Sequence, residues 1–494
     1  MKYTATFDVG TTAVKGVLVD ETGAAHLTKS VDIPTLFCGD FKEQAPEDWY
    51  QAFLQITKCF TEQYSADSIT GVIMSGQMQD VIPLDRQLRP LGNAILYSDG
   101  RAEAQAAALE QAVGAQRLEA ITGNHCDGSL PIPKLMWLRE QQPERFAGIF
   151  KVLISSKDYL IARLTGVCAG DYTACSTAGG IDIHQKCWSS DILAAADLSP
   201  DLLPALYASH SVVGSVHEQA ARECGLAVGT PVYAGVGDAG ATTLASGIDS
   251  PGQYNINLGT SGWVATVSDD VLHISGGVFN LAAMQPDCYI NVVPFLNAGN
   301  VHKWISGILA QREDGTLDYD AVGQLLARST PGSGGVLFLP YLLGERFPVL
   351  DPDVKGCYVG LTPTTSRCDM ARACLEGVAF SIRQGIEAIG RPPRRVTVIG
   401  GGAKETAWCQ ILADVIRQEV HVYKGAQELP AMALASAVML EQGIIESYGQ
   451  FTASLQSPDR CVVYTPDPAH AALYNEAFAR YLKLYPAIRM LENK

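Results

Sequence analysis

The stretch PVYAGVGDAGATTLASG, residues 231–247, holds a single carboxylate, Asp238, within a G-x-G-x-x-G pattern formed by Gly235, Gly237 and Gly240. Such a pattern marks a dinucleotide-binding fold when the next strand ends in an acid that binds the ribose hydroxyls. Here the next strand-like run ends in Gly-Thr-Ser, and Asp238 would place negative charge against a pyrophosphate. The sequence therefore argues against a dinucleotide site.

Three roles remain open for Asp238 on the residues alone. The segment AGATTLASG can start a helix, so the aspartate could be its N-cap. It could also be a solvated loop acid. The functional alternative is a carboxylate that accepts a proton from a substrate hydroxyl.

Two glycine turns with hydroxyl residues lie about half the chain apart. Residues 3–23 read as two strands that break at Gly10, Thr11 and Thr12, and residues 255–270 repeat this pattern around LGTS. Phe7-Asp8-Val9-Gly10-Thr11-Thr12 lies over Ile256-Asn257-Leu258-Gly259-Thr260-Ser261. Such a short match can arise by coincidence; as a true repeat, it indicates two similar lobes that face each other.

Turns of this kind can bind phosphate, because glycine lets an anion approach the backbone N–H groups. The first turn has Asp8 where the second has Asn257. An acid on one side only is expected if that side holds a divalent cation, since Mg²⁺ prefers carboxylate, water and phosphate oxygens. Asp8 could equally cap a turn, and this stretch alone does not decide.

A third glycine loop lies in RRVTVIGGGAKETAWCQILADVIRQEVHV, residues 394–422, which reads as strand, triple glycine, helix and strand. The flat loop at residues 400–402 could let a planar or sugar-like group lie against the backbone. It could also be a close turn between strand and helix that binds nothing.

The surrounding elements predict an α/β fold with mixed sheets. Trp49, Phe53, Ile56 and Phe60 form the apolar stripe of a helix that starts near Pro46. Two strands within residues 68–85, another near 93–101, and a strand and helix in 151–166 continue the alternation.

The length, composition and net charge of the chain limit the kinds of function that it can have. A chain of 494 residues is expected to form two large domains, and 47% apolar residues provide ample cores. A net charge of −16 disfavours nucleic acid and anionic lipid as partners. With no secretory leader or membrane-length apolar run, we expect a cytoplasmic protein. The 13 cysteines lack C-x-x-C spacing, so we expect reduced thiols, most of them buried.

Taken together, the ordered motifs resemble the FGGY family of carbohydrate kinases, and among them the xylulokinases in particular. The resemblance runs from Phe7 to about Gly443. It rests on DVGTT (8–12), SGQM (75–78), SDGR (98–101), ITGN (121–124), PKLMWL (133–138), SKDYL (156–160), GDAGA (237–241), LGTSG (258–262), LPYLLGERFP (339–348), LEGVAF (375–380) and IGGGAK (399–404).

The resemblance implies a two-lobed actin-like ATPase fold, a duplicated ribonuclease H-like unit with a cleft between the lobes. Residues 1–246 would form the N-terminal lobe with the sugar site and first phosphate loop, and residues 247–494 the C-terminal lobe. By position, Asp238 would be the catalytic base and Asp8 the acid near Mg²⁺ and the phosphates. The other implied contacts are Gly10, Thr11, Thr12, Gly259, Thr260 and Ser261 for phosphate, Gly401, Gly402 and Ala403 for adenosine, and Gln77, Met78 and Gln79 for sugar.

The implied activity is transfer of phosphate from ATP, with Mg²⁺, to a ketose hydroxyl, and the expected acceptor is D-xylulose. One departure affects the sugar pocket: xylulokinases commonly have Met-His where this chain has Met78-Gln79. Kinases of L-ribulose, gluconate, sedoheptulose or another polyol are therefore the alternatives, and a sugar-independent, chaperone-like ATPase is the alternative from another class. The family also implies that a homodimer is possible.

Overall fold

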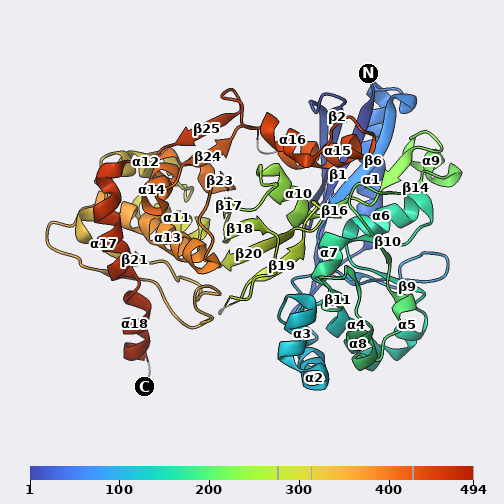
Figure 1. The fold of residues 1–494 in the computed structure, drawn as a ribbon, viewed down its shortest axis with the longest axis horizontal. Helices are drawn as coiled ribbons and strands as arrows, with labels where there is room; N and C mark the ends of the chain where they lie inside the picture. Colours follow the sequence, from blue (N-terminus) through green and yellow to red (C-terminus); the bar gives the residue numbers. More distant parts are fainter. Residues whose placement is uncertain (275–276, 313, 426–427, 493–494) are drawn as a thin grey trace.

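The computed structural model describes residues 1–274, 277–312, 314–425 and 428–492, and it contains two large sheets in separate lobes (Figure 1). The first sheet lies near the N-terminus on the right of the view, and the second lies on the left. This arrangement confirms the two-lobed α/β fold that the sequence predicts.

The first sheet has seven strands and a mixed order. β1 pairs antiparallel with β2 and parallel with β6, so the hairpin predicted for residues 3–20 is confirmed. In spatial order the strands are β14 (Val212–Ser215), β15 (Pro231–Tyr233), β6 (Ile69–Gly76), β1 (Tyr3–Val9), β2 (Ala13–Asp20) and β3 (Ala25–Asp32), with β16 (Val236–Gly237) also beside β6.

The second sheet repeats this pairing. β17 pairs antiparallel with β18 and parallel with β23, as β1 does with β2 and β6. In spatial order the strands are β19 (Phe279–Ala282), β20 (Tyr289–Phe295), β18 (Gly262–Ser268), β17 (Gln253–Leu258), β23 (Arg395–Ile399), β24 (Val420–Tyr423) and β25 (Cys461–Tyr464). The short sequence match between the two hairpins therefore reflects a repeated fold.

Helices cover both faces of the first sheet. α1 (Pro46–Gln63) packs on β2 and β3 through its apolar stripe, in which Trp49, Phe53, Ile56 and Phe60 are fully buried as predicted. The opposite face is covered by α10 (Asp238–Ala245) and by α15 (Leu429–Glu441), which contacts β1, β2 and β6. Because α15 comes from far along the chain yet covers the first sheet, the division at residues 246 and 247 stays a proposal.

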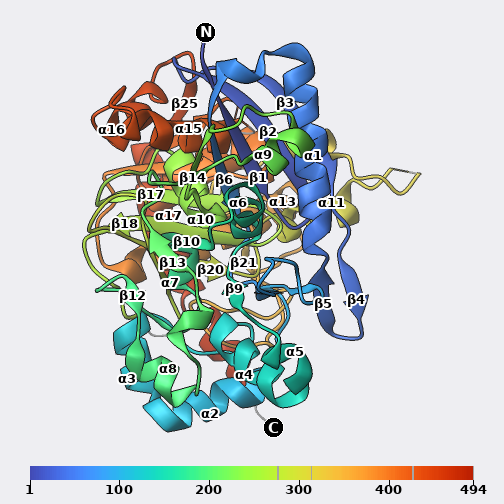
Figure 2. The ribbon, with the colours of Figure 1, turned by 90° about the vertical axis from the view of Figure 1, so that its right-hand side faces the viewer.

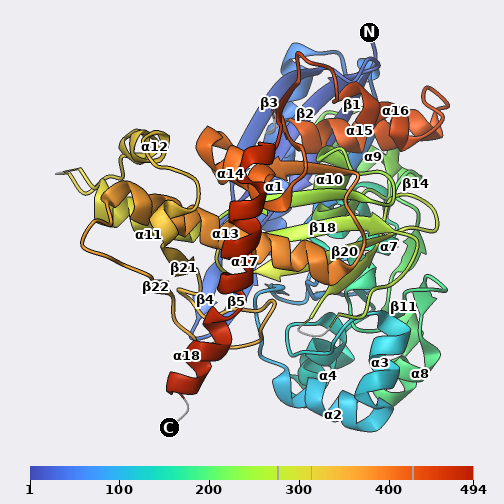
Figure 3. The same cartoon turned by 60° about the vertical axis from the view of Figure 1, so that its left-hand side comes forward.

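The second lobe is organised around one long buried helix. α13 (Arg367–Ile389) begins at a capping box made by Ser366 and Asp369, and it packs with α11, α12, α14 and α17 beside the sheet (Figure 3). The other helices of this lobe are α11 (Gly299–Leu309), α12 (Tyr319–Ala327), α14 (Thr406–Ile416), α17 (Ala471–Tyr481) and α18 (Leu484–Glu492).

A smaller helical part with its own apolar core extends from the first lobe, and a hairpin of β4 and β5 reaches down beside it (Figure 2). Its helices are α2 (Glu103–Val113), α3 (Ala115–Thr122), α4 (Pro131–Gln141), α5 (Pro143–Ala147) and α8 (Ser190–Ala195). The remaining helices and strands are β4 (Leu36–Cys38), β5 (Phe41–Gln44), β7 (Ile82–Leu84), β8 (Ala94–Ile95), β9 (Lys151–Leu153), α6 (Ser156–Thr165), β10 (Ala169–Asp171), α7 (Tyr172–Ser176), β11 (Ile181–Asp182), β12 (Cys187–Trp188), β13 (Ala205–Tyr207), α9 (Glu218–Cys224), β21 (Leu337–Leu339), β22 (Cys357–Val359) and α16 (Tyr448–Ser454).

All 13 cysteines are free thiols, as expected. The expectation that most would be buried is wrong, because only Cys175, Cys224, Cys374, Cys409 and Cys461 are. Among the described residues, no helix combines the length and the apolar character needed to cross a bilayer.

Candidate active site

Three parallel strands of the first sheet end side by side and bring the two predicted acids to one edge. Asp8 on β1 lies opposite Ser75 on β6, and Ser75 lies opposite Val236 on β16. Asp238 follows β16 directly, as the first residue of α10. Because parallel strands carry the following residues to the same edge of a sheet, Asp8 and Asp238 lie near each other although 230 residues separate them.

Asp238 is solvent-accessible but closely surrounded by protein. Its Oδ1 accepts a hydrogen bond from the N–H of Ala239 at 2.7 Å. The protein around it removes much of the water that would stabilise its charge, and this desolvation, together with the charges of Asp8 and Asp171, raises the pKa of Asp238 to about 7. A carboxyl group with a pKa near neutrality suits the role of a general base.

The structure also decides between the readings of the glycine pattern. A Cβ at Gly235 would lie 2.0 Å from the carbonyl oxygen of Met74, and a Cβ at Gly237 would lie 2.2 Å from the sulfur of Met78. At Gly240 it would lie 2.4 Å from a methyl group of Val236. The three glycines therefore allow close packing around the start of α10. Asp238 is the first helical residue and not the N-cap, and its carboxylate accepts a hydrogen bond from the N–H of the next residue.

The Asp8 side chain is held at the end of β1. Ser75 Oγ donates a hydrogen bond to Asp8 Oδ1 at 2.8 Å. Desolvation raises the pKa of Asp8, while the hydrogen bond from Ser75 and the charge of Lys15 act in the opposite direction. Two neighbouring carboxyl groups with raised pKa values create an environment that a divalent cation would stabilise.

The first glycine turn is fastened to the segment after β6. Thr11 Oγ1 donates to Gln77 Oε1 at 2.7 Å, and Gln77 Nε2 donates to Gln44 Oε1 at 2.9 Å. Gln44 in turn donates to the carbonyl oxygen of Thr11 at 2.6 Å. The N–H of Gly10 closes the turn on Ala13 O at 3.1 Å. Gln77, which we predicted to contact sugar, thus uses its buried amide to hold Thr11.

The second and third glycine loops line one pocket of about 1050 Å³ in the second lobe. Gly259, Thr260, Gly401 and Gly402 all contribute to its wall. The N–H groups of Gly299 and Asn300 donate to Gly259 O and Thr260 O at 2.7 and 3.0 Å, which fixes the loop after β17. Ser261 is exposed beside this loop, and Ala403 is half-buried and packs against the lobe's core.

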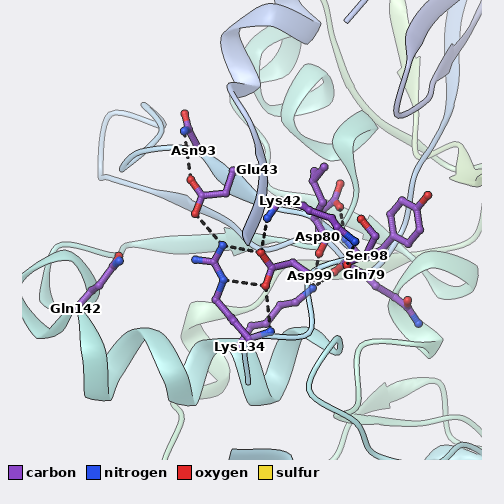
Figure 4. A network of polar contacts seen from close by, with 12 residues as sticks. Lys42, Glu43, Gln79, Asp80, Asn93, Ser98, Asp99, Lys134 and Gln142 are labelled. Atoms are coloured by element: carbon purple, nitrogen blue, oxygen red, sulfur yellow. Dashed lines mark hydrogen bonds and ion pairs between the residues drawn. The ribbon is translucent and has the colours of Figure 1, made fainter. Parts of the chain in front are cut away.

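A second pocket of about 1030 Å³ lies between the lobes, on the side of Gln79. Gln79 and Ser98 line its wall, and Figure 4 shows both side chains near Asp80. Met78 packs on Gly237, which places it next to Asp238. The first lobe contributes Lys42, Gln79, Tyr97, Ser98, Gly100, Glu103, His125, Asp127 and Ser129, and the second contributes Gly277, Val278, Phe279, Pro294, Arg346, Pro348 and Leu350.

Comparison with known proteins identifies the family. Residues 3–245 match the N-terminal domain of the FGGY family of carbohydrate kinases, and residues 254–438 match its C-terminal domain. The chain belongs to the FGGY family of carbohydrate kinases. It is therefore an ATP-dependent sugar kinase, with the two-lobed actin-like ATPase fold.

Individual relatives cover almost the whole chain. It is 33% identical over 490 residues to a xylulose kinase of Escherichia coli (strain K12), with 97% of each chain covered. It is 28% identical over 504 residues to a gluconokinase of Bacillus subtilis (strain 168), which covers 100% of this chain and 96% of the relative. A crystal structure of a xylulose kinase from Rhodospirillum rubrum matches with a TM-score of 0.90 and 26% identity over the full length of both chains.

Membership of the FGGY family of kinases implies that ATP is a substrate. Whether the chain has suitable ligands for Mg²⁺ depends on the side chains near the phosphate turns. Within the described residues, no group of three or more His, Cys, Asp or Glu side chains forms a ready metal cage. Mg²⁺ in kinases is commonly held by one or two carboxylates together with water and phosphate oxygens. Asp8, at the end of β1 beside the first glycine turn, fits that donor set.

A buried ion cluster lies behind the two acids and was missed by our sequence analysis. Lys157 Nζ lies 2.5 Å from Asp158 Oδ1 and 2.9 Å from Asp171 Oδ1, and all three side chains are fully buried. Asp171 Oδ2 accepts hydrogen bonds from the N–H of Ala174 at 3.0 Å and of Gly237 at 3.3 Å. The only sequence signal was SKDYL, where a lysine and an aspartate enter an otherwise apolar helix.

The same segment touches the other two strand ends. Ser156 Oγ donates to Val9 O at 2.7 Å, next to the first glycine turn. A Cβ on Gly76 would lie within 3 Å of Ser155, Ser156 and Lys157, so the segment packs directly on β6. The start of α6 therefore contacts the ends of β1 and β6 and reaches β16 through Asp171.

Proposed function

We propose that this FGGY kinase transfers the γ-phosphoryl group of MgATP to the fifth-carbon hydroxyl of D-xylulose, with Asp238 as the general base. One observation carries the proposal: the ends of β1 and β16 bring Asp8 and Asp238 to the same sheet edge, beside Met78. The xylulose kinases among the relatives support the choice of sugar.

In-line phosphoryl transfer needs positioning and charge neutralisation more than covalent chemistry from the protein. We propose that Gly259, Thr260, Gly401 and Gly402 hold the nucleotide, since they line one pocket. The turn at residues 10–12 would approach the phosphates from the other lobe. Ser261 and Ala403 stay predictions at the edge of this site.

Two groups act on the reacting atoms in this proposal. Asp238 would orient the acceptor hydroxyl and take its proton, a role worth about 10² to 10⁴ in rate. Asp8 would hold Mg²⁺, which supplies neutralisation of phosphate charge. Ser75 keeps the Asp8 carboxylate in place through its 2.8 Å hydrogen bond.

For the sugar we propose contacts from Met78 and Gln79. Met78 packs on Gly237 next to the base, and Gln79 lines the pocket between the lobes. The Gln79 amide can donate and accept hydrogen bonds, so it can bind sugar hydroxyls where xylulokinases have histidine. Gln77 would act indirectly, by holding Thr11.

Gluconate is the second candidate, on a specific observation. Lys42 and Arg346 line the same pocket from opposite lobes, and cations of this kind could bind a sugar carboxylate. Glu103 and Asp127 are also in the wall and would oppose an anion. The related gluconokinase keeps this alternative open for test.

The deciding experiment measures ADP release with a panel of pentuloses, heptuloses, polyols and sugar acids at fixed MgATP. We expect the highest kcat/KM with D-xylulose. A higher value with gluconate would favour the second candidate, and ATP hydrolysis that no sugar stimulates would contradict both. Light scattering on the same preparation would test the homodimer that the family implies.

A further inference from the structure

Lys134 is a fully buried lysine that the proposed chemistry does not use. It lies in α4 within the helical part of the first lobe, and its exposed fraction is 0%. Lysine is rarely buried without partners, because removing an ammonium from water is costly. The partners of Lys134 therefore indicate what the residue is for.

Those partners are two backbone carbonyls from different segments. Lys134 Nζ donates to Leu96 O at 2.7 Å and to Gln79 O at 3.2 Å. One segment follows β6 and supplies Gln79 to the wall of the pocket between the lobes. The other follows β8 and supplies Tyr97 and Ser98 to the same wall. A single ammonium thus joins two separate parts of the pocket.

Asp80 provides a second link between the same segments. Its side chain is fully buried, and its Oδ1 accepts a hydrogen bond from the N–H of Tyr97 at 3.3 Å. Its Oδ2 has no hydrogen-bond partner among the described residues. Figure 4 shows Lys134, Asp80 and Gln79 close together in this network.

The charges around Lys134 favour its ionised form. Burial lowers the pKa of Lys134 to about 8, and Asp80 is the strongest of the charges that oppose this effect. Asp99 and Asp127 act in the same direction as Asp80, whereas Arg101 acts against it. The group therefore remains largely a cation at pH 7, and its hydrogen bonds to the two carbonyls are charge-assisted.

Gln79 is held in an unfavourable backbone conformation. Its φ is +61°, in the left-handed region that residues other than glycine rarely adopt. Among the described residues, its side chain makes one hydrogen bond, a long one from Nε2 to Thr177 O at 3.4 Å. Such strain persists where the surroundings impose it, and the bond from Lys134 to the Gln79 carbonyl is one such constraint.

We propose that Lys134, assisted by Asp80, is a positioning residue for the sugar: it fixes Gln79 and Tyr97 in the pocket wall and so contributes to the choice of acceptor. The inference rests on the proposed function only in that this pocket takes the sugar. It holds for whichever acceptor the kinase uses.

The test compares Lys134→Met with wild type in steady-state kinetics with the best acceptor from the panel. Methionine keeps the length of the side chain and removes its donors. We expect KM for the sugar to rise by about tenfold, the factor that corresponds to loss of ~1.4 kcal/mol of binding, with KM for ATP within about twofold. Equal rises in both KM values, or no rise, would overturn the proposal.

Arg139→Met is the matched control. Arg139 lies on the same helix and also donates to two backbone carbonyls, Ala196 O at 2.7 Å and Asp197 O at 2.6 Å. That segment does not contribute to the pocket wall. The control should leave KM for the sugar unchanged, even if it lowers thermal stability.

A rescue experiment separates positioning from general stability. Asparagine adopts the left-handed conformation more readily than glutamine, so Gln79→Asn should need the Lys134 bond less. In a double-mutant cycle, Lys134→Met should raise KM for the sugar less in the Gln79→Asn background than in wild type. Additive effects would contradict the proposed role.

Two further variants keep the result interpretable. If Lys134→Met does not fold, Asp80→Asn keeps an acceptor for Tyr97 and removes the carboxyl group next to Lys134, and it should still raise KM for the sugar; no change would overturn the proposal. Gln79→Ala tests the pocket itself. If it leaves KM for the sugar unchanged, the pocket assignment fails; if it raises KM and Lys134→Met does not, only the role of Lys134 fails.

Discussion

The backbone N–H of Gly237 donates a hydrogen bond to Asp171 Oδ2 at 3.3 Å, and the other oxygen of Asp171 lies 2.9 Å from Lys157 Nζ. A hydrogen bond therefore connects Gly237, the residue before the proposed base, to a buried ion cluster. Asp171 also adds to the negative charge that raises the pKa of Asp238. The cluster therefore acts on both the position and the proton affinity of the base.

Removing the Asp171 carboxylate should reduce kcat with little effect on either KM. Asp171→Ala frees the backbone before Asp238, and a misplacement of about 1 Å at a reacting group can cost about 10²-fold in rate. Asp171→Asn keeps an acceptor for Gly237 and should retain more activity than Asp171→Ala. Steady-state kinetics for both substrates, with thermal unfolding alongside, measure the split.

Asp158→Asn is the control for this comparison. Asp158 contacts the same lysine at 2.5 Å, but its other carboxylate oxygen accepts a hydrogen bond from the N–H of Ser155 and not from that of Gly237. It should lower stability, as changes to buried ion clusters do, with a smaller loss of kcat. Equal losses of kcat for Asp158→Asn and Asp171→Asn would assign the cluster to stability alone.

Asp238→Asn should strongly reduce sugar phosphorylation while nucleotide binding persists. The amide keeps the shape but cannot take a proton, so kcat should fall by about 10² to 10⁴. Calorimetric titration with an ATP analogue checks that the nucleotide pocket, which lies in the other lobe, is intact. Turnover at the wild-type rate would remove Asp238 from the mechanism.

The raised pKa of Asp238 predicts two opposite pH effects. Activity needs the ionised base, so kcat/KM for the sugar should fall as the pH is lowered through about 7. The contribution of Asp238 to the stability of the folded state should change in the opposite direction, and decrease as the pH rises. Between about pH 4, where the acid titrates in an unfolded chain, and pH 7, the folded state retains a proton that the unfolded state has released, so this contribution to stability is lost as pH rises.

Thermal unfolding of Asp238→Asn checks the second effect. The variant should have a higher Tm than wild type at pH 8, where wild type carries the charge, and the difference should shrink towards pH 5. A pH-independent difference in Tm, together with an acid limb near pH 4 in wild type, would show that the Asp238 pKa is ordinary.

The candidate site residues could be found from the sequence where they lie within a few adjacent positions, and their chemical roles stay predictions. The two glycine turns, the triple glycine and the isolated Asp238 each lie in one short stretch between strands, so local patterns indicated them. The repeat of the two hairpins was visible as six aligned residues, and the matching strand order confirms it.

The supporting groups could not be derived in this way. Lys134, Asp80 and Asp171 contact partners that are distant in the chain, and Asp171 and Gly237 are 66 positions apart. Nothing in the local pattern tells a buried lysine from a solvated one. The packing of α15 on the first sheet could not be predicted for the same reason. Its contacts join segments that are distant in the sequence, and they are visible only in the folded structure.

Asp8→Asn should raise the Mg²⁺ concentration that the reaction requires, or abolish transfer. The amide can still accept the hydrogen bond from Ser75, so the turn itself should stay in place. Titrating Mg²⁺ at fixed ATP should show a higher concentration for half-maximal rate in any residual activity. An unaltered Mg²⁺ curve would favour the alternative that Asp8 only caps the turn.

Two of the three glycines in the third loop, Gly401 and Gly402, offer a paired test of the nucleotide pocket. A Cβ on Gly401 would meet no atom within 4 Å, and Gly401 lines the pocket, so Gly401→Val should fill space that the nucleotide needs without disturbing the fold. A Cβ on Gly402 would lie 2.7 Å from both Leu258 and Trp408, so Gly402→Ala should cost about 1 to 3 kcal/mol of stability by overpacking.

The two variants should affect different properties, one the KM for ATP and the other the thermal stability. Gly401→Val should raise KM for ATP by at least about tenfold, with KM for the sugar and Tm close to wild type. Gly402→Ala should lower Tm first and affect KM for ATP less. If Gly401→Val leaves KM for ATP unchanged, the nucleotide does not lie against this loop, because a valine side chain at an open position of the wall would have to contact it.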